Sequence, residues 1–428
     1  MLSKFSVQGF KSLPDASVEL GAFNVFIGAN GSGKSNLLEA LGVIGAAAFG
    51  SVEPETLRYR GVRPGLPSLY KSSFRGRAFR RIITMEASSP GSSYRVGLDN
   101  PITSPSPKWR IASERLVDDG HEVMTRAPRG CRLYAPNGTI ERIRPQPDQT
   151  VAKLALSRRD DVTQARALVE ELEGYAIYAP TTPVLRGIAR EEVSREPVGL
   201  TGGGLPEAVK ELIDRADGTL GPFDLDDVWE MIEWAEEMSA VPAPQASVSP
   251  AVKTTPVVLR FRDRFMRAER NTLSAYDASE GALYVLFLLT LVSHKRAPRV
   301  FAIDNFDHSL HPRLASALTR LVADQVVRDG TQQVLATTHS PLVIDGLNLR
   351  DERIRLFSVD RDRTGATQVK RVEISAEVAA AGGWRDTTTL LRYQQPDETT
   401  LRAVVEFERP EGGQADRGYT HSHTHTPT

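Results

Sequence analysis

Eight residues near the N-terminus, Gly28-Ala-Asn-Gly-Ser-Gly-Lys-Ser35, constrain the fold of this chain more than any other feature. They follow the apolar run Phe23–Ile27 and precede a helical pattern that begins at Asn36. Glycines at these spacings let a loop between a strand and a helix wrap closely around a phosphate group, with backbone N–H groups directed at it. A chance glycine-rich turn is the alternative, and the flanking strand and helix argue against it.

The last two residues of this loop point to a nucleotide. In loops of the form G-x-x-x-x-G-K-[ST] the lysine reaches the β and γ phosphates and the hydroxyl ligates magnesium. We therefore expect Lys34 to hold the phosphates of ATP and Ser35 to bind Mg²⁺. The expected contacts to ATP are Gly28, Asn30, Gly31, Ser32, Gly33, Lys34, Ser35 and Asn36.

Two further strand ends carry side chains suited to the same site. An apolar strand is predicted at Val300–Ile303, and Asp304 directly after it can hold the water shell of Mg²⁺. Another strand is predicted at Gln333–Thr337, and His339 follows it. A lone histidine is often structural, but a histidine beside a nucleotide is expected to contact the γ-phosphate.

The composition is typical of a soluble globular protein and gives no preference for a partner. The chain has 428 residues, 40% of them hydrophobic and 25% charged, and its net charge is −1. The single cysteine, Cys131, cannot form an internal disulfide, which fits a reducing cytoplasm. The longest apolar run, Ala282–Val292, is too short to span a bilayer, so we expect a buried helix, no membrane contact and a cytoplasmic location.

The patterning divides the chain into four parts. Strand and helix signals in 1–100 and 256–375 predict two lobes of one α/β head, a P-loop NTPase with a mixed sheet. Between them, 101–255 predicts a mostly helical insertion, irregular or short-stranded up to about 150, that ends in a Pro-rich linker. The tail 376–428 contains His421, His423 and His425, and we expect it to be poorly ordered.

Ser279-Glu-Gly281 lies directly before the long apolar helix, and by itself this sequence is simply a helix cap. The order of P-loop, Ser-x-Gly, acidic strand end and Thr-His-Ser-Pro resembles ABC-type ATPases of the RecF and SMC class. It is most similar to the single-chain AAA-family ATPases related to the overcoming-lysogenization-defect proteins, many of which are linked to phage defence. Gly9-Phe-Lys-Ser12 and the Asn24–Gly31 stretch carry this closer similarity, and the resemblance spans roughly 1–100 and 255–375.

This resemblance implies an ABC ATPase head with a composite site. The P-loop, Asp304 and His339 of one head would bind ATP, while Ser279 and Gly281 of a second head would close over its γ-phosphate. Two ATP molecules would then join two heads into a homodimer.

The chain departs from the family at the residue after Asp304. The family has a catalytic glutamate there, whereas this chain has Asn305, and an amide cannot act as a general base for the attacking water. Asp307, Asn305 and His339 are therefore the candidate catalytic residues, with His308 or a partner protein as further sources of a base. We expect weak or conditional hydrolysis.

A Toprim nuclease domain of the kind that nuclease members of this group carry is not expected here, because little sequence follows His339. Asp360-Arg-Asp362 indicates a charged hairpin turn more strongly than a metal site. The effector is therefore expected on another protein.

Basic residues alternate with aromatic residues between Thr56 and Met85, where no acidic residue occurs. Such a pattern can follow a phosphate backbone and stack on bases, so nucleic acid is a possible partner; a solvated loop packed on the core explains it equally well. The basic residues are Arg58, Arg60, Arg63, Lys71, Arg75, Arg77, Arg80 and Arg81.

These features predict an ATP- and Mg²⁺-dependent ATPase that serves as the nucleotide-gated sensor or motor of a genome-maintenance or phage-defence assembly. The alternative is a scaffold that binds ATP, hardly hydrolyses it, and restrains or displays a partner. Asn305 is the residue that separates the two hypotheses.

Overall fold

The computed structural model describes residues 1–76, 80–214, 216–246, 248–249 and 251–373. The chain divides into two units, Met1–Glu373 and Ile374–Thr428, and every described element belongs to the first. The three tail histidines lie outside the described residues, as do Arg77 and Phe79 of the basic stretch.

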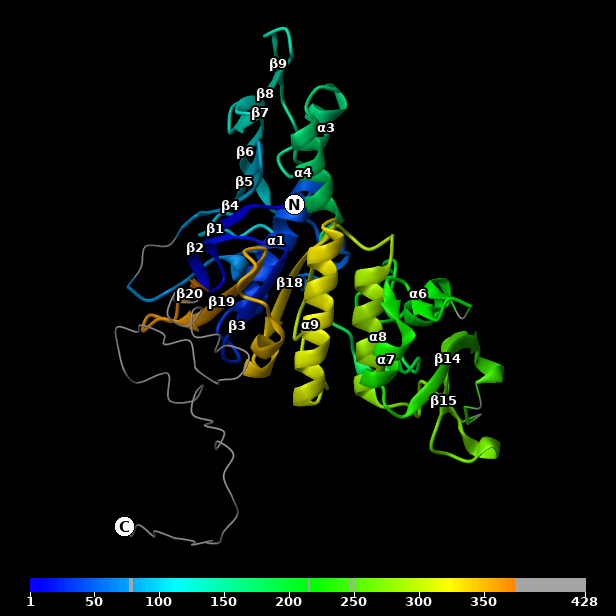
Figure 1. Ribbon diagram of the computed structural model, residues 1–428. Coiled ribbons are helices and arrows are strands. Elements are labelled where there is room, and N and C mark those ends of the chain that lie inside the picture. The colour runs from blue at the N-terminus through cyan, green and yellow to red at the C-terminus, as the bar shows by residue number, and fades with distance from the viewer. Residues whose placement is uncertain (77–79, 215, 247, 250, 374–428) are drawn as a thin grey trace, which may run out of the picture. The chain divides into compact units, whose positions relative to one another are not determined.

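Among the described residues, a mixed sheet of six strands carries the P-loop (Figure 1). Five neighbouring strands run parallel, and the sixth is antiparallel at one edge. The strand that leads into the P-loop, β3, pairs on both sides with strands from the C-terminal third of the chain. The α/β fold with a mixed sheet is therefore confirmed. In spatial order the strands are β10 (Ala176–Tyr178), β17 (Val300–Ile303), β18 (Gln333–Thr338), β3 (Phe23–Ile27), β19 (Ile354–Arg361) and β20 (Thr367–Val372).

The helices of the head start and stop where the sequence indicates. Helix α1 (Lys34–Phe49) leaves the P-loop, and α8 (Glu280–Ser293) begins after the cap residue Ser279. Proline at the first position starts α9 (Pro312–Asp329), and Gly330 ends it with φ of 67°. In α8 every residue from Ala282 to Val292 is buried, so the expected buried helix is confirmed. In the described part of the chain, no helix is long and apolar enough to cross a membrane.

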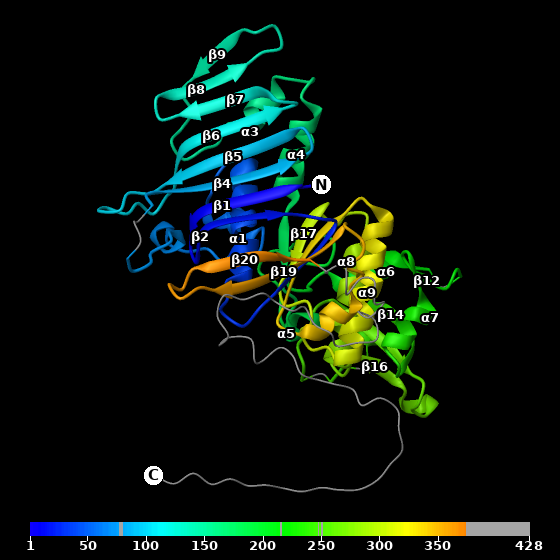
Figure 2. The ribbon, with the colours of Figure 1, turned by 60° about the vertical axis from the view of Figure 1, so that its left-hand side comes forward.

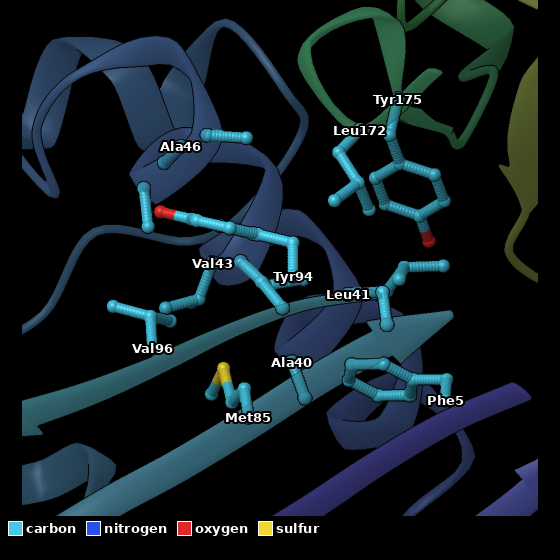
Figure 3. Close-up of a cluster of buried hydrophobic side chains, with 14 of the residues drawn as sticks. Phe5, Ala40, Leu41, Val43, Ala46, Met85, Tyr94, Val96, Leu172 and Tyr175 are labelled. Atoms are coloured by element: carbon cyan, nitrogen blue, oxygen red, sulfur yellow. The ribbon is translucent and has the colours of Figure 1, made fainter. Parts of the chain in front are cut away.

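A second sheet in the described part of the chain has eight antiparallel strands (Figure 2). Helix α1 lies against it, and side chains from α1, the sheet and α4 (Thr163–Gly174) form one apolar cluster (Figure 3). Phe5, Leu41, Met85, Tyr94 and Leu172 are each at most 2% exposed in this cluster. The P-loop helix is thus held between two sheets. The strands are β2 (Leu13–Glu19), β1 (Lys4–Phe10), β4 (Ile82–Ser89), β5 (Ser92–Asp99), β6 (Arg110–Asp118), β7 (His121–Ala127), β8 (Gly130–Tyr134) and β9 (Ile140–Ile143).

Strands β6 to β9 differ from the mostly helical insertion that the sequence indicates for this region. They continue the eight-stranded sheet past residue 100, and Ile111, Leu116, Met124 and Leu133 are buried. The glycines and prolines that made 101–150 look irregular belong largely to connections between these strands, where φ is positive at Gly120, Gly130 and Gly138. The helical spacing of 151–172 forms two helices, α3 (Ala152–Ser157) and α4.

The rest of the middle region mixes short helices and strands. The Pro-rich segment expected as a linker connects two strands of a small described sheet, β14 (Ala235–Pro242) and β15 (Val257–Asp263), whose third strand is β16 (Thr272–Ser274). Alternating acidic and apolar residues in 224–237 are typical of an amphipathic helix, but the helix is only α7 (Leu225–Met231), because the chain enters β14 at Ala235. The remaining elements are α2 (Pro54–Arg58), η1 (Pro67–Tyr70), α5 (Thr182–Leu185), α6 (Leu205–Leu212), β11 (Ile213–Asp214), β12 (Thr219–Leu220), β13 (Phe223–Asp224), η2 (Ala243–Gln245), η3 (Ala268–Arg270) and η4 (Pro341–Gly346).

Candidate nucleotide-binding site

The glycine-rich loop joins the carboxyl end of β3 to the N-terminus of α1. Gly33 is the cap residue of α1 and has φ of 111°, a region that side-chain-bearing residues rarely adopt. A Cβ atom on Gly33 would lie 2.1 Å from the Thr367 hydroxyl oxygen. Both the backbone conformation and the close neighbour therefore require glycine at this position.

Lys34 is folded back onto the loop. Its ammonium group donates to the carbonyl oxygens of Gly28 at 2.6 Å and Ala29 at 3.0 Å, and the residue is 7% exposed. Burial lowers the pKa of Lys34, and the nearby carboxylates Asp304, Asp307 and Asp360 oppose that shift. A bound phosphate would supply the negative charge that this partly desolvated cation lacks.

Ser35 and Asp304 meet at the carboxyl edge of the sheet, between β3 and β17. The Ser35 hydroxyl donates to both Asp304 carboxylate oxygens, at 3.1 and 3.0 Å. The Thr337 hydroxyl also donates to Asp304, at 2.5 Å, and accepts from the backbone N–H of Asn305 at 2.9 Å. A hydroxyl and a carboxylate together form the hard oxygen donor set that Mg²⁺ prefers, so these residues fit the expected cation. In the sequence, only the position of Thr337 in Thr337-Thr-His339, at the end of a predicted strand, indicated that it lies near the site.

The structure also brings Asp307 and His339 together. The Thr338 hydroxyl donates to one Asp307 oxygen at 2.7 Å, and the other Asp307 oxygen lies 3.8 Å from His339 Nδ1. Asp307 is buried, whereas the His339 side chain is 56% exposed. His308 turns elsewhere, with its Nε2 3.4 Å from Glu280. A carboxylate held by Thr338 and an exposed imidazole therefore face the region beside the P-loop.

Asn305 follows Asp304 in a left-handed conformation, with φ of 58°. Its backbone is fixed on both sides, because its N–H donates to Thr337 and its carbonyl accepts from the Tyr284 hydroxyl at 2.8 Å. Asparagine tolerates this conformation better than most residues. The exposed amide therefore occupies the expected glutamate position on a rigid backbone.

Ser279 and Gly281 lie at the exposed N-terminus of α8. The Ser279 hydroxyl caps α8 by accepting from Ala282 N at 3.3 Å, and a Cβ atom on Gly281 would lie 3.2 Å from the Ser309 carbonyl oxygen. Within the described residues, no hydrogen bond or ion pair joins Ser279 or Gly281 to the P-loop. The structure therefore gathers the P-loop, Asp304, Asp307 and His339 in one place and leaves the Ser-x-Gly pair outside it.

Strands β19 and β20 form the hairpin whose turn the sequence predicts near Asp360-Arg-Asp362. This hairpin supports the P-loop, and sequence reasoning did not find that contact. The Thr367 hydroxyl lies 2.7 Å from the Ser32 carbonyl and 2.7 Å from the Ser12 hydroxyl. The side chain of Asn36, which the sequence predicts to contact the nucleotide, donates to Ser12 at 2.7 Å. Arg361 Nε donates to the Gly31 carbonyl at 2.7 Å. No local pattern marks these residues, because the threonine lies 335 positions from the loop that it supports.

Five of the seven described basic residues in this stretch make hydrogen bonds or ion pairs within the protein. Arg60 is 1% exposed and donates to two backbone carbonyls, and its burial lowers its pKa to about 10. Lys71 is buried against the Asn100 carbonyl. Arg63 pairs with Glu39 and Arg81 with Asp99, at 2.6 and 2.7 Å. Contact with nucleic acid stays a prediction, and it now depends on the exposed residues Arg58, Arg75 and Arg80, of which Arg80 also donates to Gln8 Oε1 at 2.9 Å.

Two segments of the chain match models of known protein families. Residues 1–52 match "AAA ATPase domain", and residues 218–345 match "AAA domain, putative AbiEii toxin, Type IV TA system". The first segment contains the P-loop, and the second contains Ser279, Asp304 and His339. Sequence on both sides of the site is thus similar to AAA-type ATPase domains, in agreement with the predicted resemblance to AAA-family ATPases. The specific relationship to overcoming-lysogenization-defect proteins stays a prediction.

Among solved structures, the chain is similar to three heads of Smc proteins. A Smc head bound to the C-terminal winged-helix domain of ScpA is 15% identical, with a TM-score of 0.49 over 88% of this chain and 99% of that one. A Smc head with an extended coiled coil, bound to the C-terminal domain of ScpA derived from Pyrococcus furiosus, is 14% identical, with a TM-score of 0.45 over 89% and 98%. The Smc head from Thermotoga maritima is 13% identical, with a TM-score of 0.38 over 87% and 99%. No curated protein matches the chain.

Proposed function

We propose that this chain is an ABC-type ATPase head that binds ATP with Mg²⁺ and forms a homodimer around two ATP molecules. The observation that carries the proposal is the meeting of Ser35 and Asp304, with hydroxyl and carboxylate oxygens 3.0 Å apart beside the P-loop. Each head would hold one ATP on its own P-loop. Ser279 and Gly281, which lie at an exposed helix N-terminus away from that loop, would face the γ-phosphate bound by the other head.

The P-loop residues have separate tasks in this proposal. Lys34 leaves the carbonyls of Gly28 and Ala29 and binds the β and γ phosphates, where it regains a counter-charge. Ser35 and Asp304 would hold Mg²⁺, which neutralises charge on the phosphate oxygens when it is bound. The backbone N–H groups from Gly31 to Lys34 lie at the N-terminus of α1 and favour the remaining negative charge.

Hydrolysis depends on which side chain can accept a proton from water. Asn305 cannot, because an amide is not a general base. Asp307 has one oxygen held by Thr338 and the other directed toward His339, so the pair can receive a proton or orient a water molecule. We propose that ATP hydrolysis is slow and that Asp307 together with His339 supports the hydrolysis that does occur.

The biological role that fits this site is a nucleotide-gated sensor or motor in the cytoplasm, working with an effector on another protein. The family matched by 218–345 is described with a putative toxin of a type IV toxin–antitoxin system, and we propose a genome-maintenance or phage-defence assembly as the setting of this chain. A second function is favoured by Asn305 alone: a scaffold that ATP locks into a dimer and that restrains or displays a partner without turnover.

One experiment tests both functions. ATP binding, phosphate release and ATP-dependent dimerisation would be measured on the same samples of wild type, Lys34→Ala, Asp307→Ala and Asn305→Glu. Wild-type turnover that disappears in Asp307→Ala supports the ATPase with a relocated base. Dimers without turnover, made active by Asn305→Glu, support the scaffold. Normal ATP binding by Lys34→Ala would refute both.

Asn305→Glu needs a control because the residue has positive φ. A glutamate there carries a conformational cost of about 1 to 2 kcal/mol. Asn305→Asp introduces a carboxylate that tolerates the same backbone conformation. An inactive but well-folded Asn305→Asp, beside an inactive Asn305→Glu, would show that a carboxylate at this position does not restore catalysis.

A further inference from the structure

Trp234 contacts the Ser-x-Gly segment from a different part of the chain. It lies between the end of α7 at Met231 and the start of β14 at Ala235. Its indole N–H donates to the Ser279 hydroxyl oxygen across 3.4 Å, although 45 positions separate the two residues. Trp234 is half-buried, whereas Ser279 is exposed.

This contact fixes the direction in which the Ser279 hydroxyl can hydrogen-bond. A serine hydroxyl has one hydrogen to donate and two lone pairs that accept. One lone pair receives the backbone N–H of Ala282 at 3.3 Å, and the other receives the indole N–H of Trp234. With both lone pairs occupied, the hydroxyl can only donate. An exposed hydroxyl that can only donate suits an anionic oxygen, and a phosphate provides one.

Trp234 is positioned by the small sheet of β14, β15 and β16, independently of α8. Its ring packs against Phe261 of β15, with centroids 5.4 Å apart at 60°. Its carbonyl accepts from Arg264 N at 2.9 Å, and the Arg264 guanidinium donates to the Ala235 carbonyl at 2.8 Å. The small sheet therefore holds the indole in place, and the indole orients the serine.

The choice of residue matters because tryptophan donates through its ring nitrogen and cannot accept. A side chain that could also accept would allow the serine to donate to it, which would use the only hydroxyl hydrogen. A phenylalanine would keep the packing on Phe261 and remove only the donor. These two contributions can therefore be separated by mutation.

We propose that Trp234 is a positioning residue for Ser279, which it presets as a hydrogen-bond donor to the γ-phosphate of ATP held by a second copy of this chain. This inference rests on the proposed function, because Ser279 meets a phosphate only in the ATP-joined dimer. It also links the small sheet, residues 235–274, to closure of the two heads.

The test compares Trp234→Phe with wild type in dimerisation driven by a non-hydrolysable ATP analogue, measured by sedimentation velocity over a range of protein concentrations. Trp229→Phe on α7 is the matched control, since that indole is also half-buried and, among the described residues, no hydrogen bond joins it to Ser279. We expect Trp234→Phe to weaken the dimer about 10-fold, because each dimer contains the contact twice. Binding of the analogue to the monomer, followed by fluorescence, should not change.

A double-mutant cycle with Ser279→Ala separates positioning from structural support. If Trp234 acts through Ser279, adding Trp234→Phe to Ser279→Ala should weaken the dimer no further. Equal weakening in both backgrounds would overturn the inference, as would a Trp234→Phe dimer as tight as wild type. A wild type that binds the analogue and stays monomeric would overturn the proposed dimer and this inference with it.

Discussion

The Ser35 hydroxyl lies 3.0 Å from an Asp304 carboxylate oxygen, although the two residues are 269 positions apart in the chain. The contact forms because β3 and β17 end at the same edge of one sheet, two strands apart. Thr337, on the strand between them, donates to the same carboxylate. Side chains at the ends of three strands thus form the position that we propose for the cation, and each of the predictions below changes one residue in this site or in the sheets around it.

Lys34→Ala should abolish ATP binding, because it removes the cation that reaches the β and γ phosphates. Isothermal titration with ATP and Mg²⁺ would measure the loss. Lys210→Ala on α6 is the control, since it removes an exposed lysine that lies outside the site. An unchanged affinity in Lys34→Ala would contradict the assignment of the loop.

Asp304→Asn should weaken ATP binding only when magnesium is present. The substitution keeps the shape of the side chain and removes the negative charge, which should reduce the affinity for the cation roughly 10- to 100-fold. Titrations with ATP in excess MgCl₂ and in EDTA would be compared for the two proteins. Equal weakening under both conditions would mean that Asp304 supports the loop and not the cation.

Thr367→Val should weaken ATP binding about 3- to 10-fold, since it leaves the Ser32 carbonyl without its hydroxyl partner and loosens the P-loop. The two side chains have nearly the same shape, so the β19–β20 hairpin should persist. Thr272→Val on β16, where the threonine is exposed, is the control. ATP affinity equal to wild type would show that the P-loop keeps its conformation without this contact.

Glu114→Gln should change how stability depends on pH. Glu114 is fully buried and accepts from Val151 N, Ala152 N and the Tyr94 hydroxyl, and burial raises its pKa to about 7. The folded protein therefore holds this proton more tightly than the unfolded chain. The resulting stabilisation is complete below about pH 4.5 and is lost as pH rises through about 7.

Melting temperatures of wild type and Glu114→Gln would be measured between about pH 5 and about pH 8. This range includes the pKa of about 7 that Glu114 has in the folded protein. The wild type should lose up to about 3 kcal/mol relative to the variant across this window. Glu86→Gln, on strand β4, is the control. Parallel curves for wild type and Glu114→Gln would contradict the prediction.

Local motifs were sufficient to predict several of the residues that meet beside the glycine-rich loop. Gly33, Lys34 and Asp304 could be identified because a phosphate loop and a strand ending in an acid each have a mechanical sequence requirement. The residues that contact this loop from other parts of the chain could not be identified from the sequence. Thr367 and Arg361 belong to an ordinary hairpin, and only the pairing of β19 with β3 brings them to the loop.

The eight-stranded sheet and the basic stretch show a second limit of sequence reasoning. Strands β6 to β9 are short and separated by closely spaced turns, so their turn residues dominated the pattern of 101–150. In the basic stretch, charge indicated a surface, but Arg60 and Lys71 are buried because backbone carbonyls satisfy their donors. Composition cannot reveal such partners.

The place of β3 between β18 and β19 has a consequence for synthesis on the ribosome. Asn24 of β3 bonds to Val334 of β18, 310 positions later, so the P-loop strand emerges long before either neighbour exists. At ordinary rates of translation this interval lasts about 15 to 60 s. Throughout it the nascent chain presents an apolar strand with two unpaired edges and has no competent nucleotide pocket. Binding of ATP at this edge of the sheet therefore requires that β18 and β19 have already been synthesised.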